Sequence, residues 1–175
     1  MYRTDLRNKN GGGLAFLIRG IHYQSIDINT RIINNTNLEI QGVTVVWRGR
    51  PLNIFNMYHP PDLKSLSNEI LDLFVESSIC IGDLNAKHPT WGSTNTNPRG
   101  IELLNMIDDK GFITLNDGTH THYSHIYNSK EALDIAFVSP DLGPSCTWKV
   151  QENIRSDHLP ILIELKKRQS VCVNN

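Results

Sequence analysis

The chain has 175 residues, of which 39% are hydrophobic and 20% are charged, and its formal net charge is −1 at pH 7. This length fits one domain with a buried core. The near-neutral charge excludes a protein that is held to nucleic acid by overall positive charge alone. It does not exclude a nuclease, because a nuclease active site needs carboxylates to bind metal.

The three cysteines are widely spaced and form no CxxC pair. This spacing argues against a disulfide framework or a zinc finger and favours a reducing compartment. The polar start of the chain lacks the apolar segment of a signal peptide, and the apolar runs are too short to span a membrane. We therefore expect an intracellular protein without a membrane partner.

The first third of the chain is predicted to be rich in strands. Residues 1–13 are expected to form an irregular loop. Apolar or alternating runs then predict strands at 14–20, 23–29, 38–48 and 51–61. Pro60 and Pro61 should stop the last of these strands, because proline lacks the N–H group that a sheet interior requires.

Two helices are predicted among the strands that follow. Helical spacing of apolar residues predicts a helix over 62–77, with Asp62 as its N-cap. A second helix is expected over 98–111, with Pro98 near its start and Gly111 at its end. Further strands are predicted at 78–82, 112–115, 119–125, 132–140, 146–152 and 159–165. This order predicts an α/β protein with two sheets and flanking helices.

Polar or ionisable residues lie at the ends of four predicted strands. They are Asn56 to Tyr58, Asp83 to Asn85, Asp134, and Ser156 to His158. Strand ends hold side chains rigidly while leaving them open to a crevice, so active sites are common there. Asp134 is informative because a carboxylate in an apolar run is costly to bury without a partner.

These stretches contain the groups that phosphodiester hydrolysis demands. The reaction needs a divalent cation with oxygen ligands, a base for water, and donors that meet charge on the phosphate oxygens. The candidate carboxylates, amide, imidazole and phenol belong to Asp83, Asp134, Asp157, Asn85, His158 and Tyr58.

Each candidate also has a purely structural interpretation. Asp83 and Asn85 could form a turn in which their side chains satisfy local backbone groups. Asp134 could pair with an arginine, and Tyr58 could be a packed aromatic side chain. Ser156 to His158 cannot form a catalytic triad among themselves, because adjacent residues of an extended chain point to opposite sides.

His120 and His122 are weaker candidates for a metal site. They lie on one face if their stretch is a strand. No nearby cysteine or third histidine completes a zinc site. We expect them at the surface or behind the residues that bind substrate.

The order of four motifs resembles the endonuclease/exonuclease/phosphatase superfamily. The motifs are NMYHPP, GDLNAKHPTWGS, LDIAFVSP and SDHLPI. Within that superfamily, the chain resembles the endonuclease domain of non-LTR retrotransposons of the jockey-like and R1-like kind. The resemblance extends over about residues 2–166 and implies a two-sheet α/β sandwich of the DNase I-like type. We expect residues 1–166 to form this domain and residues 167–175 to form a polar tail.

The resemblance implies roles for the residues around the second motif. Tyr58 matches the tyrosine that contacts the scissile phosphate. Asp83 matches the aspartate that positions or activates the attacking water, and Asn85 matches the amide that holds the phosphate. Their spacing should place both side chains on one side of an extended backbone. His88 and Trp91 are expected to shape the loop rather than react.

The resemblance also implies roles for the last two motifs. Asp134 would orient the catalytic His158, which contacts the phosphate and stabilises the transition state. Asp157 would take part in binding Mg²⁺ or Mn²⁺. The implied substrate is double-stranded DNA in the nucleus. Its nicked 3′-hydroxyl would prime a reverse transcriptase domain of the parent polyprotein.

The chain departs from the family pattern at its start. The family opens with a strand that carries an asparagine, a helix, and a strand that carries the principal metal-binding glutamate. Neither residue stands in that setting here, and Glu39 lies in a later strand. We therefore expect the fold to lack its first strand–helix–strand segment. Asp157 alone should hold Mg²⁺ poorly, so nicking should be weak or absent.

Two alternatives to a nicking endonuclease stay open. One is a non-catalytic remnant or a DNA-binding scaffold. The other is a different phosphoesterase of the same superfamily, either a repair nuclease or a lipid or inositol phosphatase.

Overall fold

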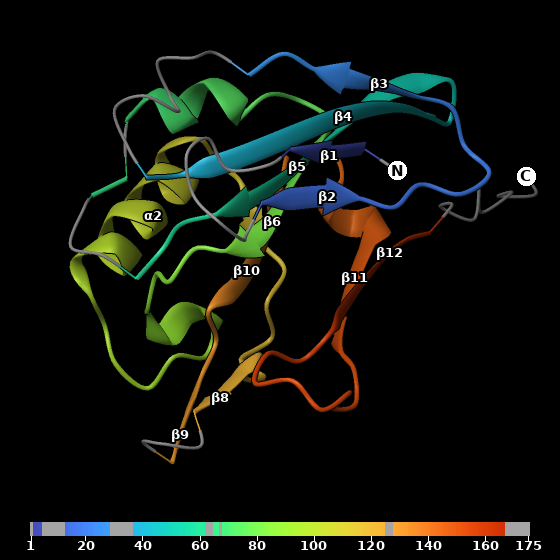
Figure 1. The fold of residues 1–175 in the computed structure, drawn as a ribbon. Helices are drawn as coiled ribbons and strands as arrows, with labels where there is room; N and C mark the ends of the chain where they lie inside the picture. The colour runs from blue at the N-terminus through green and yellow to red at the C-terminus, as the bar shows by residue number, and fades with distance from the viewer. Residues whose placement is uncertain are drawn as a thin grey trace, which may run out of the picture.

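The structure, a computed structural model, describes residues 2–4, 13–28, 37–61, 65–66, 68–124 and 128–166. A six-stranded sheet runs through this part of the chain in the order β3-β4-β5-β6-β10-β7 (Figure 1). Its strands are Tyr23–Ile26 (β3), Glu39–Trp47 (β4), Arg50–Tyr58 (β5), Ser78–Asp83 (β6), Asp134–Val138 (β10) and Ile113–Thr114 (β7). β5 and β6 are parallel, whereas the other neighbouring pairs in this sheet are antiparallel. β5 and β6 therefore end at the same edge.

Smaller elements surround the sheet. Three hairpins pair β1 with β2, β8 with β9, and β11 with β12. Their strands are Tyr2–Thr4 (β1), Leu14–Phe16 (β2), His122–Ser124 (β8), Ser129–Glu131 (β9), Cys146–Val150 (β11) and Ile161–Leu165 (β12). The described helical elements are the α-helix Pro98–Asp109 (α2) and the 3₁₀ helices Asn68–Leu73 (η1), Pro89–Trp91 (η2) and Gly143–Ser145 (η3).

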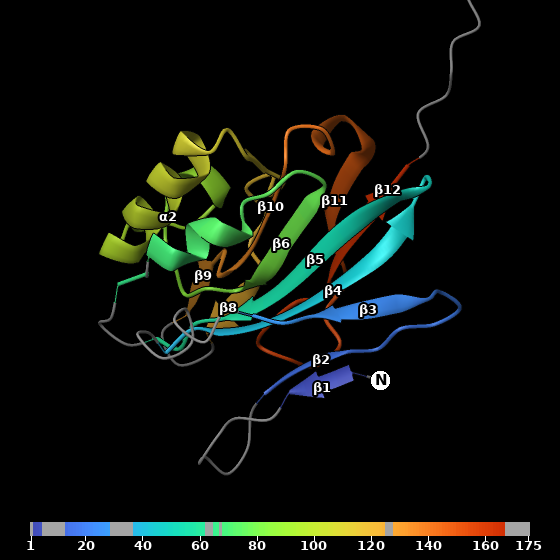
Figure 2. The same cartoon turned by 90° about the horizontal axis from the view of Figure 1, so that it is seen from above.

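Different elements cover the two faces of the six-stranded sheet (Figure 2). On one face, α2 and η1 enclose an apolar core that includes Phe55 and Phe137. On the other face, Leu52 and Ile79 pack with Ile163 of β12. The sheet therefore separates a helix-covered core from a core shared with the β11–β12 hairpin. This arrangement agrees with the expected two-sheet α/β sandwich.

Most of the expected elements are present. Strands β4, β5, β6, β10, β11 and β12 form within or close to the ranges predicted for them, and β5 ends before Pro60. Helix α2 starts at Pro98, and the side chain of its N-cap Asn97 accepts a hydrogen bond from the backbone of Gly100. Gly111, just beyond the helix, has a φ of 65°, which suits glycine. The sequence therefore contained the signals for both ends of this helix.

The helix predicted over 62–77 is wrong as an α-helix. Within the described part of this range, only Asn68–Leu73 is helical, as the six-residue 3₁₀ helix η1. The backbone N–H of Phe74 donates to the carbonyl of Leu71 at 3.1 Å. Such i→i+3 bonds characterise short 3₁₀ segments. Ser65 and Asn68 are weak helix formers, which opposes a longer α-helix. The expected N-cap Asp62 lies outside the described residues.

The loop predicted over 1–13 is wrong at its start, because β1 pairs there with β2. β9 is also a strand that the sequence did not predict, and β2 and β3 are shorter than expected. Strands of three or four residues carry too little alternation to be recognised locally. Among the described residues, Cys80 and Cys146 are free thiols. No described helix has the length and apolar character needed to cross a bilayer.

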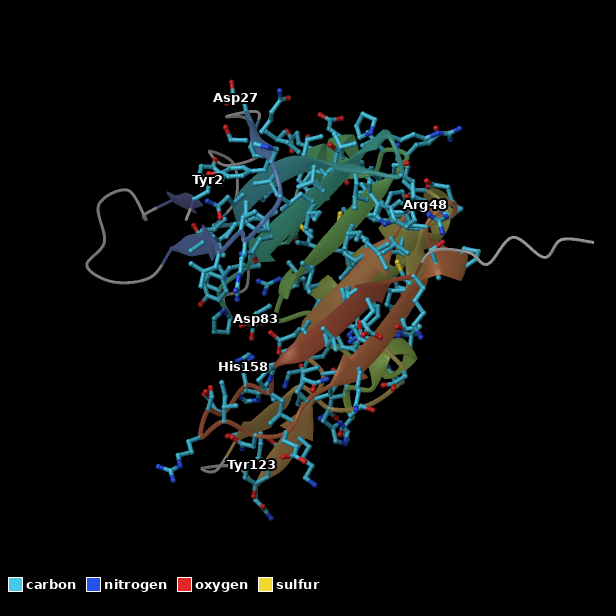
Figure 3. The ribbon with its side chains drawn as sticks, turned by 90° about the vertical axis from the view of Figure 1, so that its right-hand side faces the viewer. Tyr2, Asp27, Arg48, Asp83, Tyr123 and His158 are labelled. Atoms are coloured by element: carbon cyan, nitrogen blue, oxygen red, sulfur yellow. The ribbon has the colours of Figure 1, made fainter. Side chains whose placement is uncertain are left out.

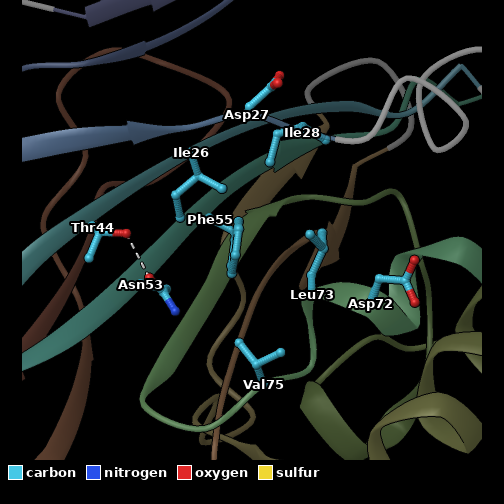
Figure 4. A pocket seen from close by; sticks show the side chains of 9 residues that line it. All are labelled: Ile26, Asp27, Ile28, Thr44, Asn53, Phe55, Asp72, Leu73 and Val75. Carbon is cyan, nitrogen blue, oxygen red and sulfur yellow. Dashed lines mark hydrogen bonds between the residues drawn. The ribbon is translucent and has the colours of Figure 1, made fainter.

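A pocket opens on the helix-covered face beside η1 (Figure 4). Phe55 and Leu73 contribute apolar walls, and Thr44 Oγ1 donates to Asn53 Oδ1 at 2.8 Å. Asp72 at its rim is exposed. The described residues that line the pocket include no histidine, cysteine, lysine or arginine. This pocket therefore offers an acidic rim but no partner for proton transfer.

Candidate active site

Strand register places four ionisable side chains in one row across the sheet. Glu39 pairs with Tyr58, Tyr58 with Asp83, and Asp83 with Asp134. Side chains directly opposite each other point to the same face of a sheet. Met57, the residue before Tyr58 in β5, packs in the helix-covered core, so the row lies on the opposite face, which carries β11–β12. The row stands at the edge where the parallel strands β5 and β6 end.

Asp83 and Asn85 meet through a tight turn. Asp83 Oδ1 accepts hydrogen bonds from the backbone N–H and from Nδ2 of Asn85, at 3.1 and 3.0 Å. Asn85 has a φ of 48°, so the expectation of an extended backbone at this point is wrong. The left-handed conformation that asparagine tolerates, rather than strand pleating, brings the two side chains together. Asp83 and Asn85 therefore form a local turn, and the same turn places their side chains close together.

The N-terminus of α2 braces this turn. Asn97 Nδ2 donates to the carbonyl of Asn85 at 2.9 Å, while Asn97 Oδ1 accepts from the backbone of Gly100 at 2.8 Å. Arg99 is only 5% exposed, and its Nη1 donates to the carbonyl of Leu84 at 3.2 Å. The NPRG stretch thus positions the Asp83–Asn85 turn, a role that the sequence alone did not reveal.

The loop after Asn85 is also fixed by internal contacts. Trp91 is fully buried, and its Nε1 donates to the carbonyl of Ala86 at 2.9 Å. Nδ1 of His88 accepts a hydrogen bond from the backbone N–H of Thr90 at 3.2 Å. These contacts agree with the expectation that His88 and Trp91 shape the loop.

Asp134 and His158 form a close pair. His158 Nδ1 lies 2.8 Å from Asp134 Oδ2, and this hydrogen bond raises the pKa of His158 because the carboxylate stabilises the imidazolium. Thr121 Oγ1 accepts from the backbone N–H groups of Leu133 and Asp134 at 3.1 and 3.0 Å. Asn116 Nδ2 donates to the carbonyl of Asp134 at 2.9 Å. The partner of Asp134 is therefore a histidine rather than an arginine.

This pair faces Asp83. His158 Nε2 lies 3.9 Å from Asp83 Oδ2, and both residues lie at one edge of the molecule (Figure 3). Burial and the nearby Asp134 raise the pKa of Asp83 to about 6. Burial and the charges of Asp83 and Glu39 raise the pKa of Tyr58. A carboxyl group that titrates near neutrality beside an imidazole with a raised pKa can move a proton and hold an anion.

His122 is the neighbour that the sequence did not place in this site. An antiparallel bridge pairs it with His158, and the two rings lie edge to face with centroids 4.7 Å apart. Burial and the neighbouring His158 lower the pKa of His122. His120 has a different environment, since its Nδ1 lies 3.1 Å from the carbonyl oxygen of Gly92. The alternation in THTHYS indicated that His120 and His122 share a face of a strand. Only the pairing of this strand shows that His122 lies beside His158.

The donor set does not fit the Mg²⁺ ion that the resemblance implies. The side chain of Asp157, the expected ligand, is 65% exposed and lies 3.9 Å from His122 Nε2. Among the described residues, the group that could hold a metal ion consists of His122, Asp157 and His158. Mg²⁺ prefers a near-octahedral shell of oxygen atoms, whereas two members of this group are imidazoles. Asp83 and Asp134 already accept hydrogen bonds from neighbouring side chains. No catalytic step is therefore assigned to Mg²⁺.

A family model and similar known proteins agree on the family of this chain. A family model described as Endonuclease-reverse transcriptase matches residues 52–162. The chain is 26% identical, over 94% of its length, to the probable RNA-directed DNA polymerase from transposon BS of Drosophila melanogaster. It is 31% identical, over 98% of its length, to the RNA-directed DNA polymerase from mobile element jockey of the same species. The chain spans only 18% and 19% of these two relatives.

A solved structure supports the fold. The chain superimposes on the endonuclease domain of TRAS1, a telomere-specific non-LTR retrotransposon, with a TM-score of 0.67 and 21% sequence identity. The match covers 84% of this chain and 68% of the other. The chain thus has a DNase I-like fold of the kind seen in that endonuclease domain, and it belongs to the endonuclease–reverse transcriptase family of the endonuclease/exonuclease/phosphatase superfamily.

Proposed function

We propose that residues 1–166 form a DNA-nicking endonuclease domain that hydrolyses one phosphodiester bond of double-stranded DNA. The observation that carries this proposal is the arrangement of Asp83 opposite the Asp134–His158 pair. Asp83 Oδ2 and His158 Nε2 are 3.9 Å apart, and the pKa values of both side chains are raised. A base and a cation that face one space suit water attack on a phosphate.

The proposed chemistry assigns one task to each side chain. Asp83, in its ionised form, accepts a proton from the attacking water. His158 presents its protonated Nε2 to a phosphate oxygen, and Asp134 stabilises the imidazolium. The amide of Asn85 and the hydroxyl of Tyr58 hold the phosphate. The new P–O bond forms as the bond to the 3′ oxygen breaks, and the leaving 3′ oxygen takes up a proton from solvent. The products are a 3′-hydroxyl and a 5′-phosphate on the nicked strand.

Divalent cations are a general requirement of this superfamily, and Mg²⁺ or Mn²⁺ would add charge neutralisation at the phosphate. Because the described donors suit Mg²⁺ poorly, we expect the 175-residue chain to nick DNA slowly. Asp157 is the side chain that we expect to contribute to what binding there is.

The biological setting forms part of the same proposal. The curated relatives are RNA-directed DNA polymerases, so we propose a reverse transcriptase as the partner domain in a parent polyprotein. The 3′-hydroxyl made by nicking would prime that enzyme. Chromosomal DNA as the substrate places the action in the nucleus.

The test is conversion of supercoiled plasmid to the open-circular form with Mg²⁺, with Mn²⁺ or with EDTA. We expect slow nicking that His158→Ala and Asp83→Asn abolish. Asp72→Asn is a matched control, because Asp72 is exposed at the pocket on the opposite face of the sheet. Nicking that survives both active-site substitutions would overturn the assignment.

The alternatives give different results in the same preparation. DNA binding without any nicking would favour a non-catalytic scaffold. Release of phosphate from a small phosphoester, with no effect on plasmid, would favour another phosphoesterase of the superfamily.

A further inference from the structure

Three potential metal ligands converge beside the proposed nuclease site. One donor atom from each of His122, Asp157 and His158 lies within 4.8 Å of the other two. Asp157 Oδ2 lies 3.9 Å from His122 Nε2. In a tetrahedral Zn²⁺ site, bonds of about 2.0 Å place neighbouring ligand atoms about 3.3 Å apart. The Asp157 side chain is 65% exposed, and its Oδ1 accepts hydrogen bonds from the backbone N–H of His158 and from Ser156 Oγ at 3.2 and 3.3 Å. A small rotation that exchanges these exposed contacts for the ion closes the difference.

The backbone fixes the two segments that carry these ligands. His122 and His158 pair through an antiparallel bridge. The backbone N–H of Tyr123 donates to the carbonyl of Asp157 at 2.8 Å, and that of Leu159 donates to the carbonyl of Thr121 at 2.7 Å. Ligands on hydrogen-bonded strands are held in place before an ion arrives, which favours a preformed site.

Each imidazole has one ring nitrogen to offer. His158 Nδ1 is hydrogen-bonded to Asp134 Oδ2 at 2.8 Å. This contact places the proton on Nδ1 of the neutral ring and leaves the lone pair on Nε2. The same carboxylate–histidine arrangement orients many zinc-binding histidines. Nδ1 of His122 is buried and has no hydrogen-bond partner among the described residues. Its Nε2 is the nitrogen that faces Asp157.

We propose that His122, Asp157 and His158 bind one divalent ion of the Zn²⁺ class, with water in the fourth position. Two imidazoles and one carboxylate suit zinc and its neighbours, whereas Mg²⁺ and Ca²⁺ favour oxygen ligands. Bound zinc occupies Nε2 of His158, the atom that faces the phosphate in the proposed reaction. Zinc therefore inhibits nicking. This inhibitory consequence rests on the proposed function, whereas ion binding does not.

Binding is tested without DNA, by titrating the 175-residue chain with Co²⁺ and following the visible absorption that marks four-coordinate cobalt. One equivalent of Zn²⁺ should then displace the cobalt and remove the absorption. We expect His122→Asn to weaken the apparent affinity at least about tenfold, the scale on which zinc sites respond to lost support. His120→Asn is the matched control, because Nδ1 of His120 lies 3.1 Å from the carbonyl of Gly92 outside the cluster.

Asp157→Asn provides a second variant in case His122→Asn does not fold, since the Asp157 side chain is 65% exposed and asparagine keeps the oxygen that accepts from the backbone N–H of His158. It should weaken cobalt binding without lowering the thermal unfolding midpoint. The absence of four-coordinate cobalt, or equal affinity in the wild type and in both folded variants, would overturn the site. If binding is confirmed but Zn²⁺ leaves plasmid nicking unchanged, the inhibitory role is overturned while the site stands. If no nicking is found at all, the proposed nuclease function fails and the cobalt titration still decides the metal site.

Discussion

Asp83→Asn should stabilise the folded chain at neutral and alkaline pH. Burial and the nearby Asp134 raise the pKa of Asp83 from 3.8 to about 6, so the folded protein holds this proton more tightly than the unfolded chain does. The stability that Asp83 contributes is therefore complete below about pH 4 and is lost as the pH rises through 6. Asparagine has the shape of aspartate without its charge, and its Oδ1 can keep accepting the hydrogen bonds from Asn85.

The size of the effect follows from the shift. About two pKa units at 1.36 kcal/mol each correspond to about 3 kcal/mol by which the ionised carboxylate destabilises the fold at pH 8. The neutral amide also loses hydration on burial, so we expect a net gain of about 2 kcal/mol. This gain should shrink towards zero at pH 4. Removing a group that the proposed function requires would thus make the protein more stable, a trade-off known from other active sites.

Urea unfolding at several pH values between 4.5 and 8, followed by tryptophan fluorescence, measures this difference in the free energy of unfolding. Trp91 is fully buried and reports loss of the loop after the active-site turn. Asp72→Asn, which changes an exposed carboxylate on the opposite face of the sheet, is the control. A variant Asp83→Asn that is less stable than wild type at pH 8, or whose effect is the same at every pH, would refute the reasoning.

Three further predictions concern the supports of the site. Gly82→Ala should prevent folding, because a Cβ at Gly82 would lie 1.7 Å from the carbonyl oxygen of Met57 in the parallel neighbour strand. The yield of soluble protein and the circular dichroism of any purified chain check this. Thr121→Val should cost about 2 kcal/mol, because two backbone N–H groups lose their acceptor; an unchanged thermal midpoint would contradict it. Asp134→Asn should move the titration of His158, followed by NMR, to lower pH, since its hydrogen bond to Asp134 is the main cause of the raised pKa.

Local signals accounted for the longer elements. The strand patterns of β4 and β5 and the proline at the start of α2 belong to short stretches of sequence, and the structure forms these elements where expected. The same local signals misread residues 62–77, where apolar spacing of three and four residues suits η1 as well as an α-helix. Periodicity reports which side chains are buried more reliably than which helix type buries them.

In the candidate site too, some residues could be identified from local sequence and others only from the fold. Asp83 and Asp134 stood out as ionisable residues at strand ends, and the structure brings them together through antiparallel pairing of β6 and β10. His122 could not be placed, because its neighbourhood depends on a bridge to His158, 36 positions along the chain. Arg99 was equally hidden, since its contact with Leu84 links a helix to a distant loop. Sequence patterns identified the chemical groups, whereas long-range pairing decided which of them meet.

The site depends on the row formed by Glu39, Tyr58, Asp83 and Asp134. An insertion or a deletion within one of their strands therefore disturbs it more than a substitution at a neighbouring position. Each member is aligned by counting residues along its own strand. Deleting or inserting one residue within β6 would rotate Asp83 to the helix-covered face, even if every neighbouring side chain kept its chemical character. Loops between these strands can therefore lengthen and exchange residues while the strands cannot change their count. Substitutions, insertions and deletions all arise in a gene. Within these strands, only substitutions leave the alignment of the four side chains intact.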